Sequence, residues 1–344
     1  MIQHDVDLSA ANTLGLPATA ERLATVTSIA EARQALIEAE RHAWPLTVIG
    51  GGSNLVLEPW LPGLVVRPAL TEHWLEAADG DTVRVHVGAG VNWHQLVVAM
   101  AERGLWGIEN LALIPGLAGA APIQNIGAYG VELAEVLEEV HLIERDGARE
   151  RVLGREECAF GYRDSVFKHA LENRVIITRL VLRLSRRPRP RLDYGDLASR
   201  VSAAASPSEI VAAVSAVRRE KLPDPARLGN AGSFFKNPRV DADQARALLA
   251  AFPTMPHFPL PDGGVKLAAG WLIDQCGLKG LRDGHVGVHD RQALVLVHHG
   301  GGSAAELLAL AERVAAAVER RFGVCLEREP RRFGQARPAG GGKP

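Results

Sequence analysis

Residues 114–130 read IPGLAGAAPIQNIGAYG, and this stretch does most to decide the fold of the chain. Glycine, alanine, proline and asparagine are dense over the wider segment 107–130. Isoleucine, leucine and tyrosine interrupt them, which is typical of an ordered loop rather than a low-complexity linker. Small residues on this scale favour a wall pressed against a large flat ligand, and Gln124, Asn125 and Tyr129 follow as a polar cluster. A loop that only packs is the alternative.

A second loop suited to close approach lies upstream. The strand expected at residues 46–49 is followed by Gly50, Gly51, Gly52, Ser53 and Asn54. Three glycines after a strand let backbone N–H groups surround a ligand, and such a nest binds pyrophosphate without cationic side chains. The segment matches neither G-x-G-x-x-G nor the phosphate-binding G-x-x-x-x-G-K-[ST] motif. A flexible turn is the alternative for this loop.

Two further blocks mix charged and polar side chains. In FGYRDSVFK at 160–168, the Arg163 guanidinium is of the type that holds a carboxylate bidentately, although a surface ion pair explains it equally well. In LEREPRR at 326–332, paired carboxylates follow an expected strand and could supply one acid. A solvated chain end is the alternative for this second block.

A serine stands in the block GNAGSFFKNP at 229–238, shortly after KLPDP at 221–225. Ser233 follows a glycine and precedes two aromatic residues, so its hydroxyl could lie in a dry, shaped pocket. The block does not match G-x-S-x-G, so the nucleophile elbow of a hydrolase is not supported.

Length and composition limit the class of protein. The 344 residues predict two or three domains, and 47% hydrophobic residues suffice for real cores. The 39 basic and 40 acidic residues argue against a dedicated nucleic-acid binder or a polybasic membrane-surface protein. Three distant cysteines without a C-x-x-C indicate neither a disulfide framework nor a zinc site. We expect a cytoplasmic protein without a metal. Because no feature of the sequence demands an oligomer, we also expect a monomer.

The order of expected elements is mixed α and β, which disfavours a TIM barrel or a plain Rossmann chain. Pairs of serine and glutamate predict capped helices, as at Ser28 and Glu31. The expected helices are 29–39, 93–103, 207–219, 268–276 and 304–322. The expected strands are 46–49, 64–67, 82–87, 136–144, 174–184, 293–297 and 324–327. The Pro/Arg run 186–191 is expected to connect two domains.

In this order, the blocks resemble the UDP-N-acetylenolpyruvoylglucosamine reductase family, from about Asn12 to Arg331. The most specific pieces are IPGLAGAAPIQNIGAYGVEL, YRDSVFK, GNAGSFFKNP and LEREPRR. The chain is similar to the subtype with an extra loop whose tyrosine covers the substrate, because LDYGDL stands at 192–197.

The resemblance implies an α+β fold. A two-part FAD-binding domain of the vanillyl-alcohol-oxidase/PCMH type would span 1–190, with subdomains of about 1–66 and 67–190. A C-terminal α+β substrate-binding domain would span 191–333, and a disordered tail 334–344.

The resemblance also implies non-covalent FAD, with NADPH as hydride donor and the enolpyruvyl ether of UDP-N-acetylglucosamine as substrate. NADPH and the UDP-sugar would use one cleft in turn. The implied flavin contacts are Gly50, Gly51, Gly52, Ser53, Asn54, Ile114, Pro115, Gly116, Gly119, Ala120, Gln124, Ile126, Gly127 and Ala128.

Matching the family motifs implies that Ser233 is the proton donor and that Arg163 and Glu329 support the enolate intermediate. Hydride addition leaves extra negative charge on the carboxylate, which a preorganised cation must meet. The implied substrate contacts are Tyr129, Tyr162, Tyr194, Lys221, Asn237, Lys266 and Gln292.

The chain departs from the family pattern in three places. Pro330 replaces the usual valine after Glu329, Phe258 stands where a tyrosine is expected, and Ala118 replaces a valine. Proline lacks an N–H group and fixes φ, so it could shift the strand end that aims Glu329. Two alternatives therefore stay open: another FAD-dependent oxidoreductase on the same scaffold, and a sugar-nucleotide-binding relative without catalysis.

Overall fold

The structure is a computed structural model that describes residues 1–195 and 197–337. The chain forms two compact units. Unit 1 comprises residues 1–6, 20–52 and 61–220, and unit 2 comprises residues 7–19, 53–60 and the chain from Lys221 onward. The predicted domain boundary after residue 190 falls inside unit 1, and so does the Pro/Arg run at 186–191.

The first sheet of unit 1 has the strand order β1-β2-β5-β3, and β3 and β5 are parallel. Helix α1 (Ile29–Arg41) packs against it through buried Ala32 and Leu36. The helix begins where predicted, because Ser28 Oγ accepts a hydrogen bond from the Glu31 N–H at 3.2 Å. The strands are β1 (Ile2–Asp7), β2 (Thr19–Val26), β3 (Leu46–Val48) and β5 (Trp60–Pro68).

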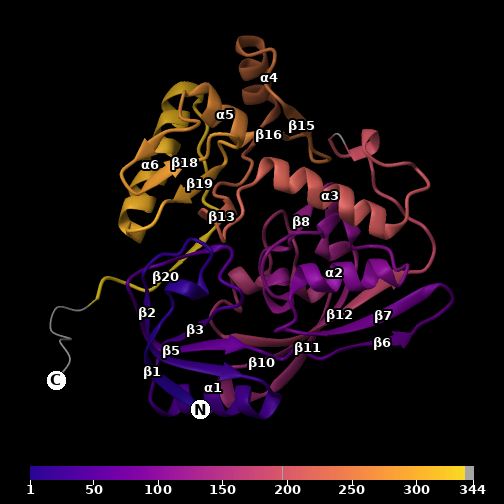
Figure 1. Cartoon of the computed structure of the whole chain (residues 1–344), viewed down its shortest axis with the longest axis vertical. Helices are drawn as coiled ribbons and strands as arrows, with labels where there is room; N and C mark the ends of the chain where they lie inside the picture. Colours follow the sequence, from indigo (N-terminus) through magenta and orange to yellow (C-terminus); the bar gives the residue numbers. More distant parts are fainter. Residues whose placement is uncertain (196, 338–344) are drawn as a thin grey trace. The chain divides into compact units, whose positions relative to one another are not determined.

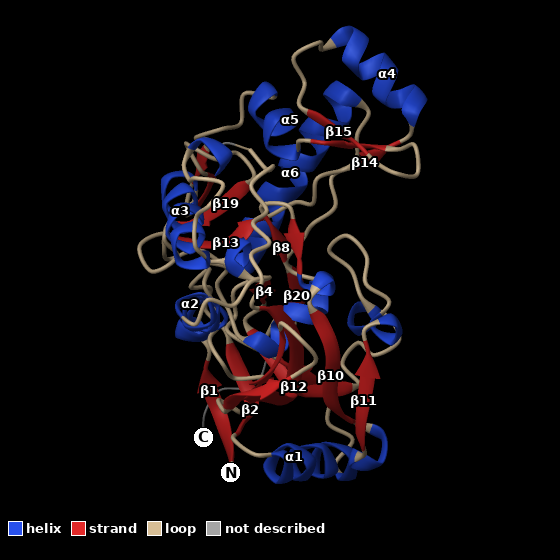
Figure 2. Ribbon diagram, turned by 90° about the vertical axis from the view of Figure 1, so that its right-hand side faces the viewer, coloured by secondary structure: helices blue, strands red, loops and turns tan. Residues whose placement is uncertain are grey.

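The second sheet of unit 1 is antiparallel, with the order β11-β10-β12-β7-β6. Alternate residues of β7 belong to the larger core, together with residues of helix α2 (Trp93–Glu102). Figure 1 shows α2 above β12 and β7. The ends of β10 and β12 also contribute Ile143 and Ile176 to the cluster around α1, and Figure 2 shows α1 below these strand ends. The strands are β6 (His73–Ala77), β7 (Thr82–Gly88), β10 (Leu137–Glu144), β11 (Glu150–Gly154) and β12 (Val175–Ser185).

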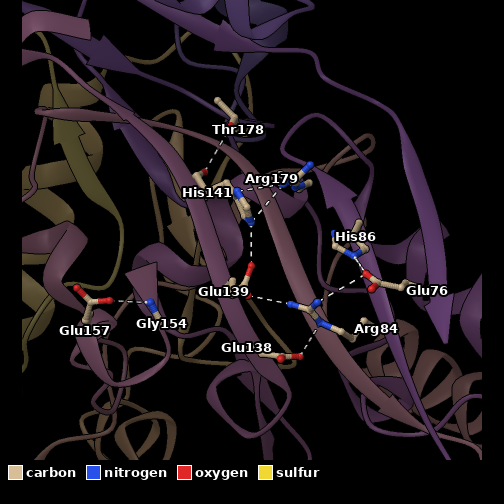
Figure 3. A network of polar contacts seen from close by, with 10 residues as sticks. All are labelled: Glu76, Arg84, His86, Glu138, Glu139, His141, Gly154, Glu157, Thr178 and Arg179. Atoms are coloured by element: carbon tan, nitrogen blue, oxygen red, sulfur yellow. Dashed lines mark hydrogen bonds and ion pairs between the residues drawn. The ribbon is translucent and has the colours of Figure 1, made fainter. Parts of the chain in front are cut away.

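The opposite face of this second sheet carries a polar network (Figure 3). Arg84 binds Glu138 and Glu139 at 3.2 and 2.8 Å. The His141 ring contacts Glu139 through Nε2 at 3.0 Å and Arg179 through Nδ1 at 3.0 Å. Burial lowers the pKa of His141, which favours the neutral ring, and only a neutral ring can accept a hydrogen bond from Arg179. The network thus pairs Arg84 with two carboxylates on this face of the sheet.

Short elements complete unit 1. The expected ordered loop 107–130 contains the 3-10 helices η2 (Glu109–Leu111) and η3 (Ala118–Gln124) and ends in a small hairpin of β8 (Gly127–Ala128) and β9 (Val131–Glu132). Helix α3 (Pro207–Lys221) packs Ile210 and Val214 into the larger core. Its predicted capping box forms, because the Ser206 N–H bonds to Glu209 and the Glu209 N–H to Ser206.

Unit 2 is built around α6 (Ala304–Phe322), whose buried stripe includes Leu307, Leu310 and Val314. The predicted capping box of Ser303 and Glu306 starts this helix. Its partner is the sheet of β13 (Gly229–Ser233), β19 (Val295–His298), β18 (Val286–Val288) and β17 (Arg282–Asp283). The other elements are β4 (Leu55–Leu57), β14 (Arg239–Val240), α4 (Ala242–Ala251), β15 (His257–Pro259), β16 (Val265–Leu267), α5 (Ala269–Gln275) and β20 (Arg331–Phe333).

The last strand was predicted in the wrong place. Residues 324–327 are irregular, and the final strand is β20, which pairs in parallel with β4. β-branched content alone does not supply a pairing partner, and the partner lies far away in the sequence. Ordered structure continues to Gln335, whose N–H bonds to Trp60 O at 2.9 Å. Residues 338–344 of the predicted tail lie outside the described residues.

Two further observations concern the described part of the chain. All three cysteines are free there, and Cys158 is buried. Burial raises the pKa of its thiol to about 12. No helix in the described residues is long and apolar enough to cross a membrane.

Gly63 in β5 offers a test of the first sheet. Its φ is +78°, and a Cβ there would lie 2.3 Å from Pro45 O. We expect Gly63→Ala to combine the left-handed penalty of about 1–2 kcal/mol with an overpacking cost of about 1–3 kcal/mol. Gly80→Ala is the matched control, because its φ is +61° and nothing lies within 4 Å. Urea unfolding should show a larger loss for Gly63→Ala, and equal losses would contradict the close approach.

Candidate active site

The glycine loop expected to bind pyrophosphate follows β3 in unit 1. Ile49 is buried and its N–H bonds to β5 at 3.0 Å, so strand pairing continues up to Gly50. A Cβ on Gly51 would lie 2.9 Å from Gly116 Cα, and one on Gly50 would lie 3.2 Å from Ala120 Cβ. The two loops that the resemblance assigns to the flavin therefore lie against each other within unit 1.

The loop around residue 118 is anchored to the segment after β7. The Ala118 N–H bonds to Val91 O at 2.8 Å, and the Gly119 N–H bonds to Ala89 O at 2.9 Å. A Cβ on Gly119 would lie only 2.6 Å from Ala89 Cβ, so this approach requires glycine. Small residues in this loop thus serve backbone contact, in addition to any contact with a ligand.

Asn125 closes the same loop. Its φ is +45°, its Nδ2 donates to Gly161 O at 3.1 Å and to Glu132 at 2.8 Å, and its Oδ1 accepts the Ala134 N–H at 3.0 Å. Asparagine tolerates the left-handed conformation and here also bonds two separate segments, 132–134 and Gly161. The loop that it closes carries the other predicted flavin contacts of unit 1: Ile114, Pro115, Gln124, Ile126, Gly127 and Ala128.

Arg163 is held in an unusual conformation. Its φ is +55°, its Nη2 donates to Gly127 O at 2.7 Å, and its guanidinium lies 5.2 Å from the centre of the Tyr162 ring. The Lys168 ammonium donates to Arg163 O at 2.9 Å. A left-handed backbone at a long side chain costs energy, and such strain is concentrated at functional sites. The predicted catalytic arginine is thereby aimed by β8.

Two tyrosines and one unpredicted arginine belong to the same unit. The rings of Tyr129 and Tyr194 make an edge contact, with centroids 5.9 Å apart. Burial lowers the pKa of the Arg218 guanidinium, Tyr129 opposes this effect, and Arg163 adds to it. The Arg218 guanidinium therefore adds a second positive charge within electrostatic range of Arg163. Sequence reasoning missed Arg218, although it lies three residues before Lys221 on α3.

In unit 2, Ser233 lies at the end of β13 beside a break in strand register. Asn230 pairs with Val297 of β19 and Ser233 with Val295, so β13 advances three residues where β19 advances two, and β13 bulges between them. The Asn230 Oδ1 accepts the Gly232 N–H at 3.0 Å, and Gly232 has a φ of +69°. Phe234 and Phe235 are fully buried directly after Ser233. The half-buried serine therefore has a backbone fixed on both sides.

Glu329 lies on a segment that pairs with the residues after Ser233. The Glu329 N–H bonds to Phe234 O at 3.0 Å, and the Lys236 N–H bonds to Glu327 O at 2.9 Å. Pro330 removes one backbone N–H donor from this segment, but the next residue still forms a hydrogen bond, because the Arg331 N–H donates to Asn54 O at 3.3 Å. The predicted acid and the predicted proton donor are thus on adjacent chain segments of unit 2.

The remaining predicted contacts of unit 2 have identifiable neighbours. Asn237 Oδ1 accepts the N–H of the first residue of α5 at 3.0 Å. The Lys266 ammonium lies 5.7 Å from the centre of the Phe258 ring. Gln292 Oε1 would lie 3.0 Å from a Cβ on Gly270. Ser53, Asn54 and Lys221 are also assigned to unit 2, whereas Gly50, Gly51 and Gly52 are assigned to unit 1.

Both halves of the chain match known protein families. Residues 20–152 match the model of an FAD binding domain, and residues 224–333 match the C-terminal domain of UDP-N-acetylenolpyruvoylglucosamine reductase. Two enzymes of that name are similar to this chain along nearly their whole length. The one from Cupriavidus pinatubonensis is 53% identical over 93% of this chain and 95% of its own, and the one from Pseudomonas aeruginosa is 50% identical over 96% and 98%.

The chain belongs to the UDP-N-acetylenolpyruvoylglucosamine reductase family. A crystal structure of that enzyme from Thermus caldophilus matches with a TM-score of 0.68 and 29% identity, covering 97% of this chain and all of the other. A crystal structure of 6-hydroxy-D-nicotine oxidase from Arthrobacter nicotinovorans, at 16% identity and a TM-score of 0.52, shows the fold alone. The predicted α+β fold with an FAD-binding domain of the vanillyl-alcohol-oxidase type is confirmed.

Family membership also confirms a flavin-dependent oxidoreductase that uses FAD and NADPH. The residues of unit 1 fit the flavin, because the two loops that carry its predicted contacts meet at Gly50 and Gly51, where the approach to Ala120 and Gly116 leaves no room for larger side chains. Of the two loops, the glycine loop after β3 would hold the pyrophosphate through N–H groups. In the described residues, no cluster of three histidine, cysteine or acidic side chains could hold a metal ion.

Gly51→Ala tests the flavin loops. A methyl group 2.9 Å from Gly116 Cα forces the two loops apart, so we expect FAD affinity to fall about tenfold or more, the effect of roughly 1.4 kcal/mol. Gly154→Ala is the control, because its Cβ would make only an ordinary 3.8 Å contact with Glu157. Flavin absorbance per protein after dialysis measures the difference. Full flavin retention by Gly51→Ala would contradict this placement of the cofactor.

Proposed function

We propose that the protein reduces UDP-N-acetylglucosamine enolpyruvate to UDP-N-acetylmuramate with NADPH, a step of peptidoglycan precursor synthesis. The chemistry that the flavin supplies when bound is hydride transfer, from NADPH and on to C3 of the enolpyruvyl group. The observation that carries the proposal is the pairing of the Glu329 segment with Phe234, next to Ser233. That pairing holds an acid and a hydroxyl of the expected types on fixed backbone.

In this proposal, Ser233 donates the proton to C2 after hydride has reached C3. A serine hydroxyl is a weak acid, so it donates only to a strongly basic carbon and must be reprotonated by a neighbouring group. The enolate meets the first condition. The fixed backbone around Ser233 supports the assignment, because general acid catalysis needs a donor within hydrogen-bond reach of its target.

Arg163 and Glu329 have complementary proposed roles. Hydride addition converts the substrate carboxylate into a form with extra negative charge, and Arg163 stabilises that charge as a preorganised cation. Its bond to Gly127 O and its contact with Tyr162 support preorganisation, since both restrict the guanidinium before substrate arrives. Glu329 assists the same intermediate.

Substrate recognition is proposed for seven further residues. The diphosphate needs cations or phenol donors, and the set contains both kinds. It consists of Tyr129, Tyr162, Tyr194, Lys221, Asn237, Lys266 and Gln292. The predicted cytoplasmic location and monomeric state remain predictions, and so does the assignment of residues 1–190 to FAD and 191–333 to substrate.

One alternative keeps a specific observation in its favour. Pro330 departs from the family pattern directly after Glu329, as a non-catalytic sugar-nucleotide-binding relative would allow. The hydrogen bonds on both sides of Pro330 speak for a retained geometry. A different substrate on the same flavin scaffold is disfavoured, because residues 224–333 match the C-terminal domain of this reductase.

Stopped-flow separation of the two half-reactions tests the proposal. We expect Ser233→Ala to leave flavin reduction by NADPH nearly unchanged and to slow reoxidation by the enolpyruvyl substrate about 100-fold or more. Ser303→Ala, which removes only the cap of α6, is the control for lost stability. Equal slowing of both half-reactions would reject Ser233 as proton donor. Failure of the unmodified enzyme to reduce the substrate would reject the function itself.

A further inference from the structure

A single buried amide connects the segments that carry two of the proposed substrate tyrosines. Asn110 lies in η2 and is completely buried. Its Nδ2 donates to Tyr129 O at 2.8 Å and to Arg191 O at 2.8 Å. Tyr129 belongs to the turn between β8 and β9, and Arg191 lies three residues before Tyr194. Both hydrogens of one amide group are therefore used to tie the two segments together.

Two other contacts between described residues of these segments involve exposed side chains. Arg191 and Glu135 form an ion pair at 3.3 Å, with side chains 59% and 41% exposed. Such surface pairs contribute little to stability. The Tyr129 and Tyr194 rings meet edge to edge, but Tyr194 is itself 48% exposed. Among these contacts, only the one made by Asn110 is shielded from water.

Asn110 is itself rigidly supported. The neighbouring Glu109 accepts the Gly107 N–H at 2.6 Å, and the Trp93 indole donates to Leu111 O at 3.1 Å. Trp93 is fully buried in the larger core of unit 1. The Asn110 amide thus holds both tyrosine segments in place against the buried core of unit 1. Tyr129 needs such support because its φ is +50°, a conformation that side chains disfavour.

The choice of side chain follows from hydrogen-bond chemistry. Two carbonyl oxygens require two donors, which a primary amide supplies and which aspartate and leucine do not. The Asn110 Oδ1 is buried and has no hydrogen-bond partner in the described residues. A buried acceptor without a hydrogen bond costs free energy. The two hydrogen bonds that the amide donates offset this cost, which is why asparagine suits this position.

We propose that Asn110 is a positioning residue that sets the spacing of Tyr129 and Tyr194 for binding of the UDP-sugar. The proposal rests on the proposed function, because the two tyrosines are substrate contacts only under that function. Asn110 acts through their backbone and does not touch substrate. Its loss is expected to loosen the 191–195 segment and to raise KM, with a smaller effect on kcat.

Trypsin reports on the segment independently of activity. Arg187 and Arg189 precede prolines and resist cleavage, whereas the exposed Arg191 precedes Leu192. We expect Asn110→Asp, which turns two donors into acceptors, to speed cleavage after Arg191 about tenfold, the effect of roughly 1.4 kcal/mol. Asn110→Ser keeps one donor and should show a smaller increase. This milder variant also serves if Asn110→Asp does not purify as a flavoprotein.

Two controls accompany this measurement. Glu135→Gln removes the exposed ion pair to Arg191 and should leave the cleavage rate nearly unchanged. Asn12→Ser removes a buried asparagine of unit 2 whose amide donates to the carbonyls of Leu8, Ser9 and Leu16, and so controls for general loss of stability. Unchanged cleavage after Arg191 in both Asn110 variants would overturn the proposal.

Steady-state kinetics test the link to substrate. We expect Asn110→Ser to raise KM for the UDP-sugar about tenfold in the otherwise unmodified enzyme, and much less in a Tyr129→Phe/Tyr194→Phe background, because the phenols are then already lost. An equal rise in both backgrounds, or faster cleavage without any rise in KM, would overturn the positioning role. An unmodified enzyme that is inactive toward the UDP-sugar would instead reject the proposed function and leave the trypsin result standing.

Discussion

Backbone contact between the loop after β3 and the loop at 116–120 is the constraint on which the flavin-binding half of this protein depends. A side chain on Gly51 would lie 2.9 Å from Gly116 Cα. Close-packed backbones expose N–H groups in a way that side chains would prevent, and this suits the phosphates of a dinucleotide. The segment after β7 anchors the second loop as well, because the N–H groups of Ala118 and Gly119 bond to Val91 O and Ala89 O.

In unit 2, the main structural constraint is the position of one small hydroxyl group, that of Ser233. Ser233 has little side chain of its own to pack, so its position is set by buried Phe234 and Phe235 and by the bulge before it. The segment ending in Glu329 then pairs with the same residues. Backbone hydrogen bonds on both sides of Pro330 explain how the chain tolerates a residue without an N–H group at this place.

Local signals in the sequence predicted local structure well. Ser28, Ser206 and Ser303 begin helices as expected, since a capping hydroxyl acts on the N–H three residues ahead and needs no distant partner. The strand at 324–327 was wrong because a strand exists only through its partner, and β4 pairs with 331–333 instead. Arg218 and Asn110 were missed for the same reason, because their partners come from other segments.

By itself, the sequence determined the family, the helix starts, the glycine-rich loops and the types of residue available for catalysis. These depend on composition and short spacing, which a linear reading contains. Only the tertiary structure decided which backbone each loop meets, that Arg163 is aimed by Gly127 O, and that Asn110 joins the segments of Tyr129 and Tyr194. These contacts join residues far apart in the chain. Their hydrogen bonds contribute to stability because burial keeps water from replacing them.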